Sequence, residues 1–467
     1  MKTTKRRFEF FTFYDHTGIA RHLERMAQKG WLLQGIHGNL WSYRTIAPTK
    51  LAFTVTYYPD ASAFDPEPSE GELCFQEFCA HTGWQLAASS AQLQIFYNDR
   101  TDPIPIETDP NLEIETIHRY AGKTILLPYS LLLFIGLLST FFFVSRLLGD
   151  PIGLLASSTN LFTGYVWCLE LLLCLTELGG YFRWRHRAKK AAVRGEFLDT
   201  RGHSLLQSVI LIAALAGFVL WLLSVLLTET ILIKATVLFT YGWMVVLALL
   251  LWGILRLLKR WKVSKDFSRI IYIIATLLLT FCMVGVIFWV GGSGYLPEPE
   301  TYTYQGSELA LYLDELPLTV EDLQPISSDD SDDYIRRRSA SQSPLLARFD
   351  MEQRPRLDAE EDLPRLEYTI TLVKVSSLYD LCRNQLLKYW NETENIGVPE
   401  GHRTSYEARD AAPWGALDAY QVVSEDCGPR ERYLLCYEDR FVEIFFDWAP
   451  TADQMAQVGT VLGQGQV

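Results

Sequence analysis

The sequence predicts a multi-domain membrane protein with a small α+β N-terminal domain, a five-helix transmembrane bundle and an α+β outer C-terminal domain. Three observations predict this fold class. Five long apolar stretches lie between residues 123 and 294. The net charge is −4 over residues 1–122, +9 over residues 123–294 and −18 over residues 295–467. Both acidic ends carry the apolar periodicity of folded domains. An apolar basic middle between two acidic ends excludes a single globular enzyme, a disordered chain and a general nucleic-acid binder.

Residues 1–110 are predicted to form a cytoplasmic α+β domain built from two α-β-β pseudo-repeats. A shift of the sequence by 53 residues places Gly30-Trp31 on Gly83-Trp84. A stretch with helical period precedes each Gly-Trp pair, and an alternating apolar run with a small-residue break follows it. Glycine suits the residue after an abrupt helix end, because that residue takes a left-handed conformation. We therefore predict that Gly30, Trp31, Gly83 and Trp84 are structural anchors of this domain.

Further strands are predicted at Phe8–Tyr14 and Leu51–Tyr58, which gives the element order β-α-β-β-β-α-β-β. The run Leu23-Glu24-Arg25-Met26-Ala27-Gln28-Lys29-Gly30-Trp31, together with the later Phe75-Gln76-Glu77-Phe78 and Gly83-Trp84, resembles a bacterial family catalogued as domain of unknown function 2812 (DUF2812). The resemblance covers about residues 8–100.

The resemblance also implies a layout and a context. Longer members of the family are similar in adding transmembrane helices and an outer domain. The family has no assigned activity and no known catalytic residues, so the resemblance implies none for this chain. Members are often encoded beside PadR-type transcription regulators, which implies a regulated function in the bacterial envelope.

The transmembrane bundle is predicted over residues 123–294. Each of its five apolar stretches is long enough to cross a hydrocarbon core, which needs roughly 20 residues. The predicted helices run at about 126–148, 155–179, 204–227, 231–255 and 270–291.

The direction of insertion follows from the lysines and arginines of the short loops, because loops rich in these residues stay on the cytoplasmic side. Loops 183–203 and 256–269 contain seven and six of them, whereas loops 149–154 and 228–230 contain none. This alternation predicts a multi-pass protein of the cell membrane with a cytoplasmic N-terminus and an extracytoplasmic C-terminus.

One candidate polar site lies inside the predicted membrane segments. Glu170 and Glu177 are seven residues apart on the second helix, so both carboxyl groups lie on one helix face. Glu170 is expected near the midplane, where a charge costs several kcal/mol unless it is paired or protonated. The residues fit either a proton- or cation-sensitive site or a protonated glutamic acid that holds neighbouring helices together.

Residues 295–467 are predicted to form an extracytoplasmic α+β domain. The Ser- and Asp-rich run that begins at residue 327 is followed by consecutive arginines, and this composition predicts a flexible loop over residues 327–343. Cys427 and Cys436 are a candidate disulfide if the outer face is oxidising, and two free thiols are the alternative.

The sequence contains no Walker A, dinucleotide-binding, metalloprotease or nucleophile-elbow motif. We therefore predict no catalytic residue, no metal ligand and no cofactor. The predicted function is that of a non-enzymatic envelope sensor or regulatory adaptor that couples the outer domain to the cytoplasmic domain. The alternative is a transport or channel component that uses Glu170 and Glu177. The expected partners are the lipid bilayer and an unidentified cytoplasmic protein, with a functional link to a PadR-type regulator and no direct nucleic-acid binding.

Overall fold

The computed structural model forms two compact units. The first unit contains Met1–Thr140, Tyr165–Val219 and Ile231–Gly292, and the second contains Phe141–Gly164, Leu220–Thr230 and Ser293–Val467. The division runs through helices, so each unit combines a soluble domain with segments of the membrane helices. The structure describes residues 4–100, 102–200, 202, 204–228, 231–292, 300–326, 330–359 and 363–465.

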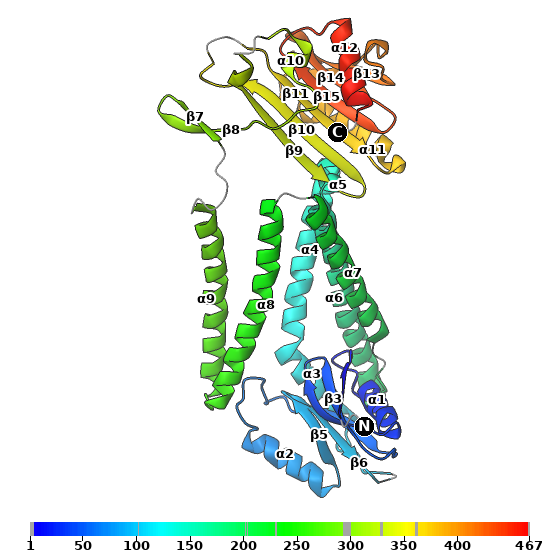
Figure 1. The fold of residues 1–467 in the computed structure, drawn as a ribbon. Helices are drawn as coiled ribbons and strands as arrows, with labels where there is room; N and C mark the ends of the chain where they lie inside the picture. Colours follow the sequence, from blue (N-terminus) through cyan, green and yellow to red (C-terminus); the bar gives the residue numbers. More distant parts are fainter. Residues whose placement is uncertain are drawn as a thin grey trace. The chain divides into compact units, whose positions relative to one another are not determined.

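The predicted fold class is confirmed: an N-terminal α/β region, five candidate membrane helices and a β-rich C-terminal domain follow one another along the chain (Figure 1). The N-terminal domain has the predicted order of strands and helices. Its first half contains β1 (Thr4–Phe8), α1 (His16–Gln28), β2 (Trp31–His37) and β3 (Leu40–Thr45). Its second half contains β4 (Ala52–Tyr57), α2 (Glu70–His81), β5 (Gln85–Ser90) and β6 (Leu93–Asn98).

The two halves share their topology and several backbone details. The antiparallel sheets have the equivalent orders β1-β3-β2 and β4-β6-β5. Gly30 and Gly83 follow the two helices with φ of +79° and +92°, a conformation that favours glycine. The second strand of each sheet carries a register shift, between Leu33 and Gly35 in β2 and at the matching positions in β5. Half of the domain thus repeats the other half at a spacing of 53 residues.

The prediction of a first strand at Phe8–Tyr14 was wrong for all but one residue. Strand β1 ends at Phe8, and the following residues turn toward helix α1. The Asp15 carboxylate accepts a hydrogen bond from Gly18 N at 3.1 Å and thereby caps α1. The Tyr14 side chain is 1% exposed, because it packs into the main core of the domain.

Trp31 and Trp84 are not equivalent in their packing. Trp84 is 3% exposed, contacts Cys79 and Phe96, and donates its indole N–H to the carbonyl of Ile104 at 2.8 Å. Trp31 is only half-buried at the edge of the main core, with the Lys5 ammonium 5.3 Å from its ring centroid. The difference arises because the chain after β6 covers Trp84.

The core of the N-terminal domain continues beyond residue 110, the predicted end of the domain. Helix α3 (Pro110–Thr124) buries its apolar face in the main core, and the end of α6 (Ser158–Ala192) does the same. The side chains that α6 contributes to this core are Tyr181, Trp184, Ala188 and Ala192. A membrane helix therefore supplies part of the hydrophobic core of this domain.

Among the described residues, five helices are long and apolar enough to cross a membrane, as predicted, with different bounds. They are α4 (Leu126–Gly149), α6, α7 (Ser204–Thr228), α8 (Ile231–Arg260) and α9 (Lys265–Gly292). The predicted second span began at residue 155, but residues 151–156 form a separate helix, α5 (Pro151–Ala156). Asp150 caps α5 and Pro151 occupies its first turn, so a new helix starts there.

The C-terminal domain is built on a seven-stranded antiparallel sheet with the order β12-β13-β14-β15-β11-β10-β9. Its strands are β9 (Tyr334–Gln342), β10 (Leu346–Pro355), β11 (Leu366–Val373), β12 (Thr404–Arg409), β13 (Asp418–Ser424), β14 (Gly428–Cys436) and β15 (Arg440–Phe446). A separate hairpin contains β7 (Glu300–Tyr304) and β8 (Ser307–Leu311), and the helices are α10 (Val320–Leu323), α11 (Tyr379–Lys388) and α12 (Ala452–Val458). A π-helical segment, η3 (Tyr389–Thr393), continues α11.

The prediction of a flexible loop over residues 327–343 was wrong for most of its length. Residues 330–333 form a 3₁₀ turn, and residues 334–342 form β9, which pairs with β10 along its whole length. Residues 327–329 lie outside the described residues. The low-complexity composition did not prevent a strand here, because the backbone hydrogen bonds of β9 are made with β10, the next strand in the sequence.

The two faces of the seven-stranded sheet differ in what covers them. Alternate residues such as Phe349, Ile370 and Ile444 pack on one face with residues of α10 and α12. On the other face, one end is apolar and packs against α5 and α11. The remaining part of that second face carries the charged residues of β10, β11, β14 and β15. This charged area forms the floor of a pocket.

Candidate functional site

The structure brings the two glutamates predicted as an intramembrane polar site to one cavity in the first unit. The cavity has a volume of about 490 Å³ and its wall includes Glu170, Glu177, Gln207 of α7 and Tyr129 of α4. The rest of the wall is mainly apolar and includes Phe10 and other residues of the N-terminal domain. Both glutamates therefore point to the same space, as their spacing on one helix implied.

The two carboxyl groups have different partners. Glu177 is 2% exposed and accepts a hydrogen bond from the side-chain amide of Gln207. Oε1 of Glu170 accepts a hydrogen bond from the Cys174 thiol at 3.1 Å, while Oε2 has no hydrogen-bond partner among the described residues. A Cβ at Gly136 of α4 would lie 2.1 Å from this Oε2. Because Gly136 has no side chain, the Glu170 carboxyl group can occupy this space against α4.

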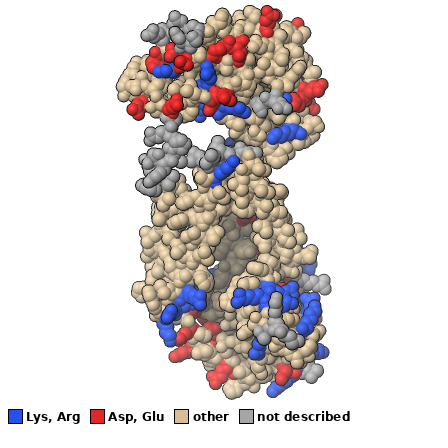
Figure 2. Space-filling view, viewed as in Figure 1, with Lys and Arg blue, Asp and Glu red and all other residues tan. Residues whose placement is uncertain are grey.

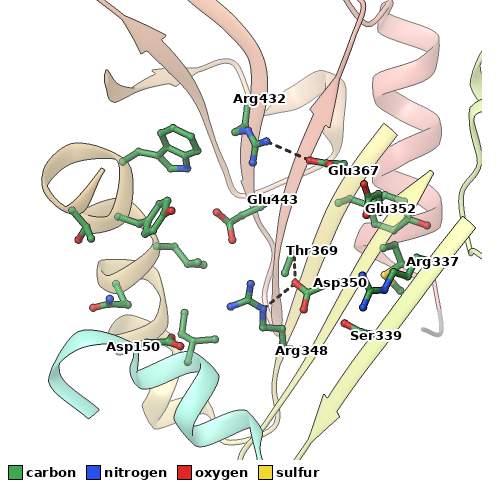
Figure 3. A pocket seen from close by; sticks show the side chains of 18 of the residues that line it. Asp150, Arg337, Ser339, Arg348, Asp350, Glu352, Glu367, Thr369, Arg432 and Glu443 are labelled. Carbon is green, nitrogen blue, oxygen red and sulfur yellow. Dashed lines mark hydrogen bonds and ion pairs between the residues drawn. The ribbon is translucent and has the colours of Figure 1, made fainter. Parts of the chain in front are cut away.

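A larger pocket, which the sequence did not predict, lies on the charged part of the seven-stranded sheet (Figure 3). Its volume is about 890 Å³, within the range of small-molecule sites. Strands β9, β10, β11, β14 and β15 form its floor, while α11, η3 and the segment before and within α5 form its wall. The charged residues in its lining are Asp150, Arg337, Arg348, Asp350, Glu352, Glu367, Arg432 and Glu443.

Ion pairs fix several of these side chains. Nε of Arg348 lies 3.0 Å from Oδ1 of Asp350, and the Thr369 hydroxyl donates to the same oxygen at 2.8 Å. The Arg432 guanidinium lies 3.6 Å from Glu367 and 5.4 Å from the ring centroid of Trp390. These contacts hold each guanidinium group against its own carboxylate and leave the centre of the pocket open (Figure 3).

Glu443 lies between the two guanidinium groups at the centre of the floor (Figure 3). It makes no ion pair with any residue that the structure describes. Burial raises the pKa of Glu443, and the nearby charges of Arg348 and Arg432 only partly oppose this effect. Glu443 is therefore an enclosed carboxyl group that faces an open pocket.

The wall of the pocket includes the connection between two membrane helices. Gly149, Asp150 and Ile152 line it, and α5 is held there by specific contacts. The Gln385 amide donates to the Gly149 carbonyl at 2.8 Å, and the Ser343 hydroxyl donates to the Leu155 carbonyl at 2.6 Å. The short segment between α4 and α6 is thus a structural part of the C-terminal domain.

The candidate disulfide between Cys427 and Cys436 is not formed. Cys427 precedes β14 and Cys436 is its last residue, so nearly the whole strand separates them. Nine residues of strand span about 30 Å, whereas disulfide-bonded Cα atoms lie less than about 7 Å apart. Both are free thiols, and Cys436 is buried. Within the described residues, no group of three His, Cys, Asp or Glu side chains has the arrangement of a metal site.

Comparison with known proteins identifies the N-terminal region. Residues 16–129 match the family model described as protein of unknown function (DUF2812). This match confirms the resemblance and extends it from about residue 100 through α3 to the start of α4. Searches of curated proteins and of solved structures found no match.

Proposed function

We propose that this chain, a DUF2812 region joined to five apolar helices, is a sensor or regulatory adaptor of the bacterial envelope. In this proposal the C-terminal domain binds a ligand in the 890 Å³ pocket, and the N-terminal domain contacts a protein partner on the cytoplasmic side. A PadR-type regulator is a candidate for a functional link. The protein has no catalytic role in this proposal.

The observation that carries the proposal concerns α6 and the segment before it. Residues between α4 and α6 line the pocket, and α6 itself continues for 35 residues without a break. The last turns of the same helix bury Tyr181, Trp184 and Ala188 in the core of the DUF2812 region. One helix therefore connects the wall of a pocket with the interior of the other soluble domain, so a ligand that moves the wall can affect the domain.

The proposed orientation is an N-terminus in the cytoplasm and a C-terminus outside the cell membrane. Figure 2 shows Lys and Arg gathered beside the N-terminal domain, and the α8–α9 connection contributes to this surface. Lys259, Arg260, Lys262, Lys265 and Arg269 lie in or beside that connection. Positively charged loops favour the cytoplasmic side, which supports this orientation.

The coupling can be tested without knowledge of the natural ligand. We would fill the pocket covalently by reacting Ser339→Cys with biotin maleimide, in the full chain in nanodiscs, after replacing the exposed cysteines. Those cysteines are Cys74, Cys168, Cys282 and Cys427. Ser339 lines the pocket, whereas Ser405, the control position, is exposed on β12 and is not part of its lining.

The measurement is hydrogen exchange in residues 181–192 and in α1. We expect the label at residue 339 to change exchange in both segments, and the label at residue 405 to leave it unchanged. Equal exchange in the two labelled proteins would contradict coupling through α6.

One observation favours a second candidate function, a transport or channel component. The cavity of about 490 Å³ contains both Glu170 and Glu177, and polar groups at membrane depth often mark a substrate path. The close approach of the Glu170 carboxyl group to Gly136 of α4 supports the other interpretation, in which Glu170 joins two helices. Substitution of Glu170 separates the two functions, as argued in the Discussion.

A further inference from the structure

We propose that the pocket of the C-terminal domain binds an organic cation, whose primary ammonium or guanidinium group pairs with Glu443. This inference rests on the proposed function of the pocket as a ligand site and adds the chemical class of the ligand. It is carried by the charge balance of the lining, by the pairing of the charged groups and by the shape of the pocket.

The lining has an excess of negative charge. Five carboxylates and three guanidinium groups line the pocket, which leaves a formal charge of −2 when all of them are ionised. The field in a concave site with low-dielectric walls attracts ions of the opposite sign. The pocket therefore favours a cation over an anion before any specific contact is considered.

The pairing of these groups selects Glu443 as the binding group. Arg348 is occupied by Asp350, and Arg432 faces Glu367. Glu352 lies 3.5 Å from the guanidinium group of Arg365, outside the pocket lining. Asp150 accepts a hydrogen bond from Gly153 N at 2.9 Å as the cap of α5. Among the described carboxylates of the lining, Glu443 is the one without an ion pair or a capping role.

An anionic ligand meets a less favourable arrangement. At Arg348 or Arg432 it would have to compete with Asp350 or Glu367 for a guanidinium group that is already paired. Arg337 is the guanidinium group of the lining that makes no ion pair with a described residue, so it alone is open to an anion without that competition. A cation at Glu443 leaves both pairs intact. It also adds positive charge beside an enclosed carboxylate whose burial the charges of Arg348 and Arg432 offset only in part.

The wall opposite the floor suits the hydrocarbon part of such a cation. Tyr389 and Trp390 of η3 line the pocket, and Tyr389 is 43% exposed. Aromatic faces attract ammonium and guanidinium groups and contact aliphatic chains. A volume of about 890 Å³ exceeds that of a single amine group, so the ligand extends beyond the charge at Glu443.

The cationic group has two sources, a free polyamine and a basic side chain of a peptide. The experiment therefore uses spermidine and trilysine amide as separate probes, with succinate as the anionic probe, in isothermal titration of the full chain in nanodiscs. The variants are Glu443→Gln, Glu443→Asp and Glu407→Gln. Glu407 is an exposed residue of β12 outside the pocket lining and serves as the matched control.

We expect wild type and Glu407→Gln to bind at least one cationic probe equally well. Loss of one partner of an enclosed charge pair should weaken binding by at least about tenfold in Glu443→Gln. Glu443→Asp keeps the charge and should retain most of the affinity. Binding of trilysine amide without spermidine would assign the site to a basic peptide, and the reverse result would assign it to a free amine.

Equal binding by wild type and Glu443→Gln, binding of succinate in place of the cations, or no binding of either cation would overturn the cation assignment. The covalent label at residue 339 tests the proposed function independently. If that label alters the N-terminal domain while both cations fail to bind, the pocket remains the sensing site and only the ligand class is wrong.

Discussion

Tyr14 and Trp184 stack on one another, with ring centroids 5.7 Å apart and an interplanar angle of 23°. Tyr14 precedes the first helix of the N-terminal domain, and Trp184 belongs to a helix that is apolar enough to cross a membrane. Both side chains are buried in the same core. The domain is thus attached to α6 by packing as well as by the chain.

The first prediction concerns this attachment. Trp184→Ala should destabilise the N-terminal domain by about 3–5 kcal/mol, because a large buried aromatic side chain is lost from its core. Hydrogen exchange of α1 in the full chain in nanodiscs measures the effect. Trp261→Ala is the matched control, since Trp261 is 66% exposed. Equal exchange in both variants would show that the core does not depend on α6.

The second prediction compares the two tryptophans of the pseudo-repeat. Trp84→Ala should cost about 3–5 kcal/mol because its ring is enclosed and its N–H is hydrogen-bonded. Trp31→Ala should cost roughly 1–2 kcal/mol, since part of that ring already contacts water. Exchange rates in β5 and β2 of the respective variants, measured side by side, give the two values. An equal loss would show that the two tryptophans contribute equally despite their different burial.

The third prediction separates the structural and transport interpretations of Glu170. Glu170→Gln should be made at the normal level and keep the function that a deletion strain lacks, because an amide of the same shape can fill the same space and accept the Cys174 thiol hydrogen bond. Glu170→Leu should loosen helix association modestly, because a branched side chain replaces the carboxyl group that occupies the space beside Gly136 of α4. Protein level and the deletion phenotype are measured together. A Gln variant that is made normally yet behaves as the deletion would favour transport, because Gln cannot release a proton.

The fourth prediction is the orientation of the chain. Alkaline phosphatase fused to the C-terminus should be active and a fluorescent protein fused to the N-terminus should fluoresce, since the Lys- and Arg-rich loops stay inside. Reporter activity in intact cells measures both. Phosphatase that is active at the N-terminus and inactive at the C-terminus would reverse the assignment.

The fifth prediction uses the raised pKa of Glu443, which burial causes. In the folded protein this carboxyl group keeps its proton to a higher pH than in the unfolded chain. The contribution of Glu443 to the free energy of unfolding is therefore lost as the pH rises from its pKa in the unfolded chain through its higher pKa in the folded protein. The groups that face Glu443 are Arg348, Asp350, Arg432, Tyr389 and Tyr406.

Melting temperatures of ligand-free wild type and Glu443→Gln, measured from pH 4 to pH 8, check this prediction. The melting temperature of Glu443→Gln should increase relative to that of the wild type as the pH rises. Cation binding to the wild type should strengthen over the same range, because the ionised carboxylate is the binding form. A constant difference in melting temperature would show that Glu443 does not titrate differently in the folded state.

Features that depend on local periodicity could be predicted from the sequence. The five apolar helices follow from length and composition. The repeat follows from Gly30 and Gly83, because a helix end favours glycine at the residue of positive φ that comes next. The end of α6 was missed because Arg183, Arg185 and Arg187 mark the membrane boundary. The spacing of Tyr181, Trp184 and Ala188 was the available signal that the helix continues with an apolar face.

The pocket could not be predicted for a different reason. Arg348 and Asp350 alternate with buried residues of β10, and this pattern is the same for a strand face in water as for a pocket floor. A pocket floor differs from an open strand face only because η3 and α5 cover this part of the sheet. Their placement depends on contacts between distant parts of the chain, such as the hydrogen bond from Gln385 to Gly149. Strand β9 was missed similarly, because its Ser- and Arg-rich sequence gains order by pairing with β10.

The unbroken course of α6 also constrains how this protein can vary in length. Each added residue advances a helix by 1.5 Å and turns it by about 100°. One insertion between residues 165 and 180 would therefore rotate the face that carries Tyr181 and Trp184 away from its core, whereas seven insertions would nearly restore its angular phase. Length changes in this part of α6 are therefore expected in steps close to two turns, because only these keep Tyr181 and Trp184 facing their core.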